Sequence, residues 1–539
     1  MKTITRVLSV FALLILSCNV AFANVSDKSS FSQALLGKSS QQKIAAINWL
    51  VANQPEDEVK PILTAWLNGQ LYYFEPAQQP ENALYIIEDI KQQSEAINGW
   101  DGSVLTIENR RDFDKVRVNN KLRSVIRTEL ATLRLNSTQA QTRAAAVIEL
   151  LSESDQEVID LLAKRQAVET DATVIELLNL ALAINTAKSG TGAERIEAIT
   201  TLADYKQPEV YKTLAGLLSS ETDPDVQAAA KRSLDAYQQS QSLYSGVETL
   251  FFGLSLGSVL VLAGIGLAIT FGVMGVINMA HGELIMIGAY TTYVLQQLMP
   301  AMPGVALVLS IPAAFVVSGL VGIAIERSVI RHLYGRPLET LLATFGISLI
   351  LQQAVRSIFS PLNRSVTTPD WMSGALQINP MLSITYNRLY IVLFCAMVFI
   401  GLVMILKKTP LGLQVRAVSQ NRAMARAMGI HSERVDALTF GLGSGVAGIA
   451  GVALSQLTNV GPNMGQAYII DSFMVVVFGG VGNLWGTLVA GLGLGLFNKV
   501  LEPWAGAVMA KILMLVFIIL FIQKRPRGLF PQRGRAAEG

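Results

Sequence analysis

The sequence is poor in charged residues and in cysteine. Charged residues make up 15% of its 539 residues, whereas soluble domains carry about 25%, and hydrophobic residues make up 51%. This shortage of charge indicates that part of the chain lies in lipid. Only two cysteines, Cys18 and Cys395, are present, which excludes a disulfide framework. The net charge of +3 averages two dissimilar halves, and we expect no nucleic-acid partner.

An intact ATP-binding loop is also missing. Gly37-Lys38-Ser39 resembles the end of a P-loop, but Ser32 stands where the first glycine is needed and no predicted strand precedes it. Any energy from ATP must therefore come from a partner. We identify no catalytic, metal-binding or cofactor-binding motif, and we expect no enzyme activity.

Residues 1–23 have the three parts of a secretory signal peptide. Lys2 and Arg6 flank an apolar run, Val7–Leu16, and Ala21-Phe22-Ala23 offers a small-residue cleavage site. A lipoprotein-type signal ending at Cys18 matches less well. A first transmembrane helix is the other alternative, but about ten apolar residues are too few to cross roughly 30 Å of hydrocarbon. The sequence therefore predicts that residues 24–244, which are soluble in character, are exported.

The exported region 24–244 carries a repeat of amphipathic helix pairs. Residues of the first copy recur at one constant offset in the second, and a weaker copy begins at Lys43; the aligned pairs include Arg143 with Arg195, Ala146 with Ala198, and Leu150 with Leu202. Helix pairs that cannot bury their apolar faces alone stack into an α-solenoid, which we expect to be HEAT-like. Residues 71–74 and 103–107 predict strands of a small β insertion. The domain serves either as a binding face or as a spacer.

Residues 245–523 are predicted to form a bundle of about nine membrane-spanning helices, followed by a basic tail, 524–539. The overall fold is thus expected to be all-α apart from the β insertion. A helix is expected for each apolar run because lipid cannot satisfy exposed backbone groups. The runs are 246–269, 282–299, 303–325, 338–359, 388–406, 436–456, 466–483, 485–500 and 505–522.

Basic residues gather in three segments that we predict to be cytoplasmic. They lie in 327–336, 407–434 and the tail, whereas the loop 360–387 holds only Arg364. Counting back from a cytoplasmic tail through nine spans leaves Tyr244 outside. The signal peptide gives the same answer independently, which predicts a multi-pass bacterial inner-membrane protein with a periplasmic N-terminal domain.

Polar residues set between apolar runs are candidates for a translocation path. Asn278, His281 and Glu283 lie between the first two spans, and ionisable groups inside a membrane are costly and often functional. The alternative is a turn at the cytoplasmic interface, where these groups are solvated or cap the next helix. Asp471 is a further candidate, with the same alternative. Gly480 and Gly482 are also candidates, because the segment Phe478–Gly486 indicates a hairpin or broken helix. Most other membrane glycines are expected to serve helix packing.

The loop after the fifth span predicts a helix suited to bind another protein. Residues Gly412–Ile430 form one amphipathic helix that ends at Gly429, with basic residues set among apolar ones. A free helix of this kind also lies on anionic lipid. Between two spans, it is how importers dock into a groove of an ATPase subunit. The candidate coupling residues are Gly412, Val415, Arg416, Arg422, Ala423, Arg426 and Gly429.

Three segments together resemble LivH-type permeases of ABC importers for branched-chain amino acids. They are MGVINMAHGE (274–283), VRAVSQNRAMARAMGI (415–430) and FGGVGNLWGTLVAGLGLG (478–495). The resemblance implies two cytoplasmic ATP-binding subunits, a second, LivM-like permease and a periplasmic solute-binding protein. The fused exported domain is similar to the urea permeases of the UrtB type.

The leading hypothesis is therefore the permease subunit of an ATP-driven urea importer. Import of branched-chain amino acids or other small amides is the alternative within the same class. A passive solute channel is the alternative from another class, and it would have no need of the coupling helix.

Overall fold

The computed structural model describes residues 25–37, 39–76, 83–90 and 95–530. The predicted signal peptide and most of the basic tail lie outside these residues. The chain divides into two compact units after Gln238, which we call the N-terminal and C-terminal units. The predicted boundary at 244 lies close by, and both positions fall within one uninterrupted helix, α11 (Pro224–Met274).

The N-terminal unit is mostly helical. Its helices are α2 (Lys28–Leu36), α3 (Ser40–Asn53), α4 (Glu56–Asn68), α5 (Asn120–Arg134), α6 (Ala140–Leu150), α7 (Gln156–Val168), α8 (Ala172–Ser189), α9 (Gly192–Thr201) and α10 (Pro208–Ser220). One core lies between α2–α5 around the fully buried Trp66. Apolar burial of this kind stabilises the unit by about 25 cal/mol per Å².

The two aligned repeats fold as equivalent helix pairs. The first is α6 with α7, and the second is α9 with α10. The aligned arginines also form equivalent ion pairs, Arg143 with Glu169 and Arg195 with Glu221. The repeat is therefore real in three dimensions, while its assignment to the HEAT type stays a prediction.

A five-stranded antiparallel sheet lies between α4 and α5 in the sequence. Its order is β4-β3-β2-β1-β5, from strands β1 (Leu71–Phe74), β2 (Leu84–Ile86), β3 (Glu95–Asn98), β4 (Val104–Thr106) and β5 (Phe113–Lys115). The predicted strands correspond to β1 and β4. The other three, β2, β3 and β5, were not predicted. Tyr72, Tyr85 and Phe113 form a small core on the sheet.

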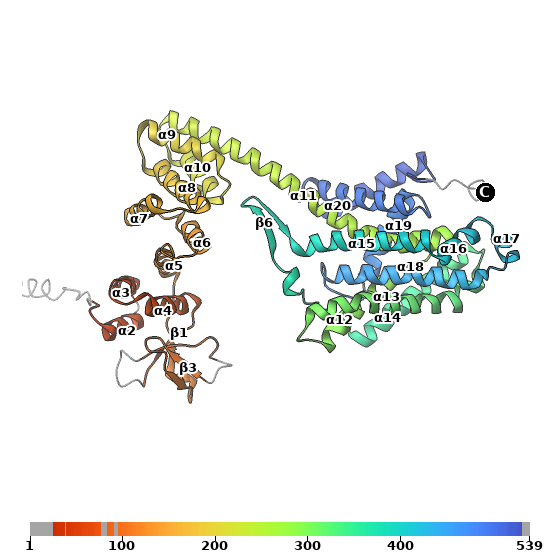
Figure 1. The fold of residues 1–539 in the computed structure, drawn as a ribbon, viewed down its shortest axis with the longest axis horizontal. Coiled ribbons are helices and arrows are strands. Elements are labelled where there is room, and N and C mark those ends of the chain that lie inside the picture. Colours follow the sequence, from red (N-terminus) through yellow and green to blue (C-terminus); the bar gives the residue numbers. More distant parts are fainter. Residues whose placement is uncertain (1–24, 38, 77–82, 91–94, 531–539) are drawn as a thin grey trace, which may run out of the picture. The chain divides into compact units, whose positions relative to one another are not determined.

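The C-terminal unit is a bundle of apolar helices. They are the last part of α11, then α12 (His281–Leu298), α13 (Pro303–Ser328), α14 (Pro337–Phe359), α15 (Tyr386–Lys408), α18 (Ser432–Ser455), α19 (Met464–Gly479) and α20 (Leu484–Lys524). Short elements also occur, namely α16 (Pro410–Gln420), α17 (Arg422–Ala427) and a hairpin of β6 (Ala375–Asn379) and β7 (Leu382–Thr385). The hairpin, which the sequence analysis missed, lies at one end of the unit, and α16 and α17 lie at the other (Figure 1).

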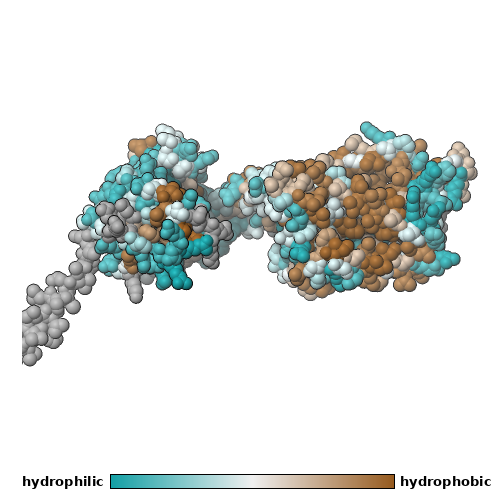
Figure 2. All heavy atoms as spheres, turned by 90° about the horizontal axis from the view of Figure 1, so that it is seen from below, coloured by the Kyte–Doolittle hydropathy of each residue, from teal (hydrophilic) through white to brown (hydrophobic). Residues whose placement is uncertain are grey.

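Each of the nine predicted spans overlaps a helix. Six helices in the described residues are long and apolar enough to cross a membrane, and α19 is a shorter apolar helix. The last two predicted spans fall on the two helices of α20, which meet at a kink at Gly506 (φ 78°). The flank of the unit carries a broad hydrophobic belt with hydrophilic surface at its ends (Figure 2). The number of spans remains a prediction.

Close glycine contacts hold the centre of this bundle together. A Cβ on Gly288 of α12 would lie 2.0 Å from the carbonyl oxygen of Gly448 on α18. A Cβ on Gly495 of α20 would lie 2.2 Å from the backbone nitrogen of Gly257 on α11. The packing interpretation of these glycines is therefore confirmed, because any side chain would push the helices apart.

Backbone contacts join segments that the charge pattern assigns to the same side. Arg364 and Val460, both predicted outside, exchange hydrogen bonds of 2.7 and 2.8 Å. On the predicted inner side, the end of α19 bonds to the start of the tail, where Leu529 N donates to Phe478 O at 2.9 Å. The helix count and the charge pattern are thus mutually consistent, and which side faces the cytoplasm stays a prediction.

Candidate functional site

The chain between α11 and α12 is non-helical and partly buried. Helix α11 ends at Met274, Gly275 follows with φ 64°, and α12 begins at His281. Thr344 of α14 hydrogen-bonds the backbone of this segment, because its Oγ1 accepts from Met279 N at 3.1 Å. Irregular backbone at membrane depth requires such internal partners.

Asn278, His281 and Glu283, which we call the buried cluster, lie in this segment and at the start of α12. Their side chains are 0–1% exposed. Ser348 Oγ donates to Glu283 Oε1 at 3.1 Å, and Ser348 lies near the middle of the span α14. Burial therefore excludes solvation of these groups, whereas the alternative that they cap the next helix stays open, because Asn278 Oδ1 accepts from Ala280 N at the start of α12. The segment dips into the protein, which local sequence does not reveal.

Each residue of the buried cluster keeps one polar atom without a partner. His281 Nε2 donates to Ala263 O at 2.8 Å, and Ala280 N donates to Asn278 Oδ1 at 3.0 Å. The atoms left without a partner among the described residues are Asn278 Nδ2, His281 Nδ1 and Glu283 Oε2. Unsatisfied buried groups are rare in folded proteins, and each one calls for an explanation.

Three other predicted path residues lie in different surroundings. Asp471 of α19 is buried and receives Lys511 Nζ of α20 at 3.4 Å. Gly480 (φ 102°) and Gly482 (φ 78°) form the tight turn between α19 and α20. A Cβ on Gly480 would lie 2.6 Å from Phe530 O, so these contacts give the turn a structural reason for glycine. A role of these residues in translocation stays a prediction.

The predicted coupling helix is two helices, and the prediction of one continuous helix is wrong. Asn421 has φ −153° and separates α16 from α17. Its side chain caps α17 by accepting from Met424 N at 3.0 Å. Asparagine competes with the helix for backbone hydrogen bonds, which explains the break. The predicted end at Gly429 is confirmed by its φ of 86°.

The basic residues of α16 and α17 brace the loop. Arg422 donates to both carboxylate oxygens of Asp436 at 2.7 and 2.8 Å, and its Cζ lies 3.9 Å from the Tyr334 ring centre. Arg426 Nε donates to Ser432 Oγ at 2.6 Å, and Arg416 Nη1 donates to Leu406 O at 2.7 Å. These arginines therefore hold the position of the two helices.

The inner face of α16 and α17 is packed against the bundle. Val415 belongs to a small core with Val418, Ala425 and Val435. Gly412 meets the end of α15 so closely that a Cβ would lie 1.9 Å from Leu406 O. Ala423 is exposed. Of the candidate coupling residues, Gly412 and Val415 therefore pack against the bundle, the arginines brace the loop, and Ala423 lies on the surface.

Three large apolar side chains of this loop face outward. Leu413 is 64% exposed, Met424 61% and Met428 77%. They stand beside the bracing arginines on what we call the α16–α17 surface, residues 410–430. Exposed apolar groups ringed by polar ones mark a binding surface, and methionine adapts to varied partners.

Comparison with known proteins identifies the family. The family model described as "Branched-chain amino acid transport system / permease component" matches residues 249–522. The chain belongs to this permease family. Both the buried cluster and the α16–α17 surface lie within the matched segment.

Several of the matched relatives are permeases named for branched-chain amino acids, and others are named ribose import permeases. The chain is 30% identical over 296 residues to the high-affinity branched-chain amino acid permease BraD of Pseudomonas aeruginosa, covering 53% of this chain and 96% of the relative. It is 30% identical to LivH of Escherichia coli K12, covering 52% and 94%, and 26% identical to a probable LivH of Methanocaldococcus jannaschii, covering 50% and 88%. No solved structure matches the chain at a significant level.

The family assignment and the apolar helices make this chain a multi-pass membrane protein. Sequence reasoning about the permease missed several residues of the site. Asp436 and Tyr334, which hold Arg422, lie outside the predicted coupling segment. An acidic residue one turn into the next span was a usable signal, because a buried carboxylate needs a cation nearby. The exposure of Met428 had no such signal, because outward and inward methionines look alike in sequence.

Proposed function

We propose that this chain is a permease subunit of an ATP-driven importer for branched-chain or similar neutral amino acids. The observation that carries the proposal is the α16–α17 surface, whose exposed Leu413, Met424 and Met428 stand on a braced loop at the end predicted to be cytoplasmic. A passive channel has no use for such a surface. The names of the relatives support the solute class.

The prediction of urea finds no support among the relatives. It depended on the fused exported domain, and the family match covers the C-terminal unit alone. The relatives named for branched-chain amino acids favour the alternative that the sequence analysis kept open.

The proposal includes the partners and the orientation. Two ATP-binding subunits would bind the α16–α17 surface from the cytoplasm, a second, LivM-like permease would complete the path, and a solute-binding protein would deliver the amino acid from outside. The N-terminal unit, a HEAT-like stack by our interpretation, would lie in the periplasm. Its helix-pair repeat supports that fold, and the positive-inside pattern supports that side.

The buried cluster is our proposed place for part of the path. Transporters commonly bind solute where a helix begins inside the membrane, because the N-terminal backbone N–H groups and the positive dipole end are available there. Helix α12 begins in this way, with three orphaned polar atoms around its first turn.

Uptake of labelled leucine and labelled urea at micromolar concentration tests the proposal. Cells lacking the subunit should lose leucine uptake and keep urea uptake. Met428→Glu should abolish co-purification of the ATP-binding subunits and leucine uptake together, because a charge would be buried at the apolar contact. Met302→Glu, at a similarly exposed apolar position of the opposite end, is the matched control and should retain both. Loss of urea uptake alone would overturn the solute assignment.

Sidedness can be measured with added cysteines. Cys395 is buried and Cys18 lies in the predicted signal peptide, so background labelling should be low. A cysteine at exposed Ser219 should react with an impermeant maleimide in intact cells, and one at exposed Met428 only after permeabilisation. The reverse pattern would contradict the orientation.

A further inference from the structure

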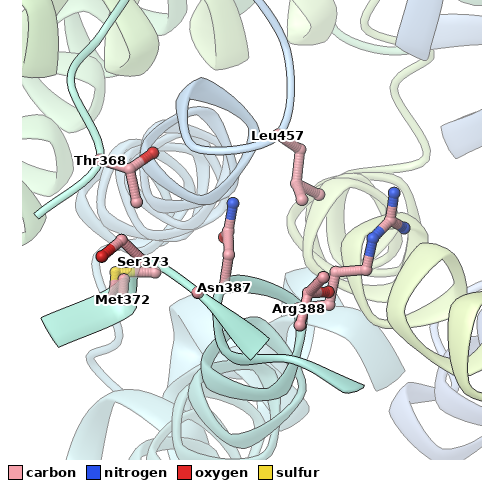
Figure 3. A pocket seen from close by; sticks show the side chains of 8 residues that line it. Thr368, Met372, Ser373, Asn387, Arg388 and Leu457 are labelled. Carbon is pink, nitrogen blue, oxygen red and sulfur yellow. The ribbon is translucent and has the colours of Figure 1, made fainter. Parts of the chain in front are cut away.

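A second polar site lies at the opposite end of the C-terminal unit from the α16–α17 surface. A cavity of about 370 Å³ is bordered by Thr368, residues 372–374, the start of α15 and Leu457. We call it the hairpin cavity, because β6 and β7 lie in the chain between residues 372–374 and α15. Its volume is at the lower end of small-molecule sites. Figure 3 shows Asn387 between Thr368 and Leu457, with Arg388 on the Leu457 side.

Arg388 gives the hairpin cavity a positive charge. Its Cζ lies 4.6 Å from the ring centre of Phe252, which holds the guanidinium by its face. Among the described residues no carboxylate forms an ion pair with it, unlike Arg422, Arg143 and Arg195. A guanidinium offers two parallel N–H groups that match the two oxygens of a carboxylate.

The start of α15 adds to this positive charge. Thr385 is the N-cap residue, and its side chain makes no cap hydrogen bond, while Tyr386 N donates to Gly374 O at 3.2 Å. The positive end of the helix dipole favours an anion at this position. The geometry therefore offers one place for a carboxylate, between Arg388 and the first turn of α15.

Two oxygen atoms at the same cavity lack a hydrogen-bond donor. They are Thr385 Oγ1 and Asn387 Oδ1, both buried and without a partner. Asn387 is held in its orientation because its Nδ2 donates to Gln456 O at 2.6 Å. A buried acceptor without a donor costs free energy, and an ammonium group of a ligand supplies donors. Met372 and Leu457 provide apolar wall for a hydrocarbon side chain.

From these groups we infer that the hairpin cavity binds a neutral α-amino acid with an apolar side chain as its zwitterion. Arg388 receives the carboxylate, Asn387 and Thr385 receive the ammonium, and Met372 with Leu457 contact the side chain. The inference rests on the proposed function and adds a solute site at the predicted outer mouth of the path. A neutral amide such as urea would leave the guanidinium without a counter-charge.

Equilibrium binding of labelled leucine to the purified full-length chain in lipid nanodiscs tests the inference. We expect saturable binding that Arg388→Gln weakens by at least about tenfold, the loss typical of a charge-assisted hydrogen bond. Arg388→Lys should retain part of the affinity, and leucinamide, which lacks the carboxylate, should compete poorly. Arg356→Gln is the matched control, since Arg356 also lies near the predicted outer end but bonds to Asn463; it should bind leucine as the unchanged chain does.

Two results would overturn the inference. One is leucine binding of unchanged affinity in Arg388→Gln, with the variant eluting as the unchanged protein does. The other is the absence of saturable binding at millimolar leucine. If the Arg388→Gln variant in addition no longer binds the solute-binding protein, the cavity is a docking site for that protein. Leucine uptake in cells that lack the subunit tests the proposed function separately. If these cells lose leucine uptake but Arg388→Gln binds leucine with unchanged affinity, the inference is wrong and the proposed function stands.

Discussion

Arg143 and Glu169 form a buried bidentate ion pair that closes one helix pair of the N-terminal unit. Arg143 Nε donates to Glu169 Oε2 at 2.8 Å and Nη2 to Oε1 at 2.6 Å. Arg195 and Glu221 form the corresponding pair in the next repeat, with Nη2 and Oε2 2.6 Å apart. In both repeats the glutamate also accepts from the two backbone N–H groups that follow it. Each pair thus fixes where the next helix begins.

Removing Arg143 should destabilise the N-terminal unit more than removing Arg195. The Glu169 side chain is 0% exposed, so Arg143→Met leaves a carboxylate buried with fewer partners, at a cost of about 3–5 kcal/mol. The Glu221 side chain is 16% exposed, so Arg195→Met, the matched variant, should cost less because water reaches the freed carboxylate. Pulse proteolysis of the full-length protein in urea measures both. Equal losses would contradict the burial argument.

The same pair should make the N-terminal unit sensitive to acid. Hydrogen bonds from Arg143, from the N–H groups of Asp171 and Thr170 and from Arg165 hold the pKa of Glu169 well below its usual range, although burial opposes this. A carboxyl whose pKa is lower in the folded state contributes stability that is complete above the unfolded pKa, about 4.3, and is lost as pH falls below it. Glu169→Gln should therefore be less stable near pH 7 and lose less on acidification to pH 3. This prediction would be contradicted if the free energy of unfolding of Glu169→Gln and of the unchanged protein decreased equally with falling pH.

The loop that carries the α16–α17 surface should depend on Arg422 and Asp436 as a pair. Arg422→Ala leaves the buried Asp436 without its cation, and Asp436→Ala leaves Tyr334 and Arg422 without their anchor. We expect each change to reduce leucine uptake by at least about tenfold, consistent with about 1.4 kcal/mol or more. Combining Arg422→Asp with Asp436→Arg should restore part of the uptake. Arg434→Ala, which changes an exposed arginine at the start of α18, is the control. A bracing role would be excluded if both single variants kept normal leucine uptake and the variant with the exchanged pair did not.

The features that could be predicted from the sequence are those that depend on residues close together in the chain. Helix periodicity, the repeat around Arg143 and the position of each apolar run are local patterns, and all reappear in the structure. Glu169 was missed because its arginine lies on the preceding helix, so only folding brings the two together. The break at Asn421 was missed because the amphipathic pattern continues on both sides of it.

The candidate site divides in the same way. Local sequence indicated that Asn278, His281 and Glu283 were unusual, but a surface turn and a buried one have the same composition. Burial depends on Thr344 and Ser348 of α14, which reach the segment from far along the chain. Arg388 escaped notice because a basic residue at the start of a span is ordinary, and its cavity forms only when the hairpin and the loop after α18 come together.

Glu283 should contribute to transport at the expense of stability. Its carboxyl group is almost fully buried and receives one hydrogen bond, from Ser348, while Oε2 has no partner among the described residues. An amide costs less to bury than a carboxylate, so Glu283→Gln should leave thermal stability unchanged or slightly higher. If the free oxygen contacts solute, the same variant should lose leucine uptake by at least about tenfold, the loss typical of a charge-assisted hydrogen bond. Ser348→Ala, which removes only the donor, is the control and should keep most of the uptake. A structural role predicts the opposite outcome for Glu283→Gln, namely lower thermal stability with uptake per inserted molecule preserved.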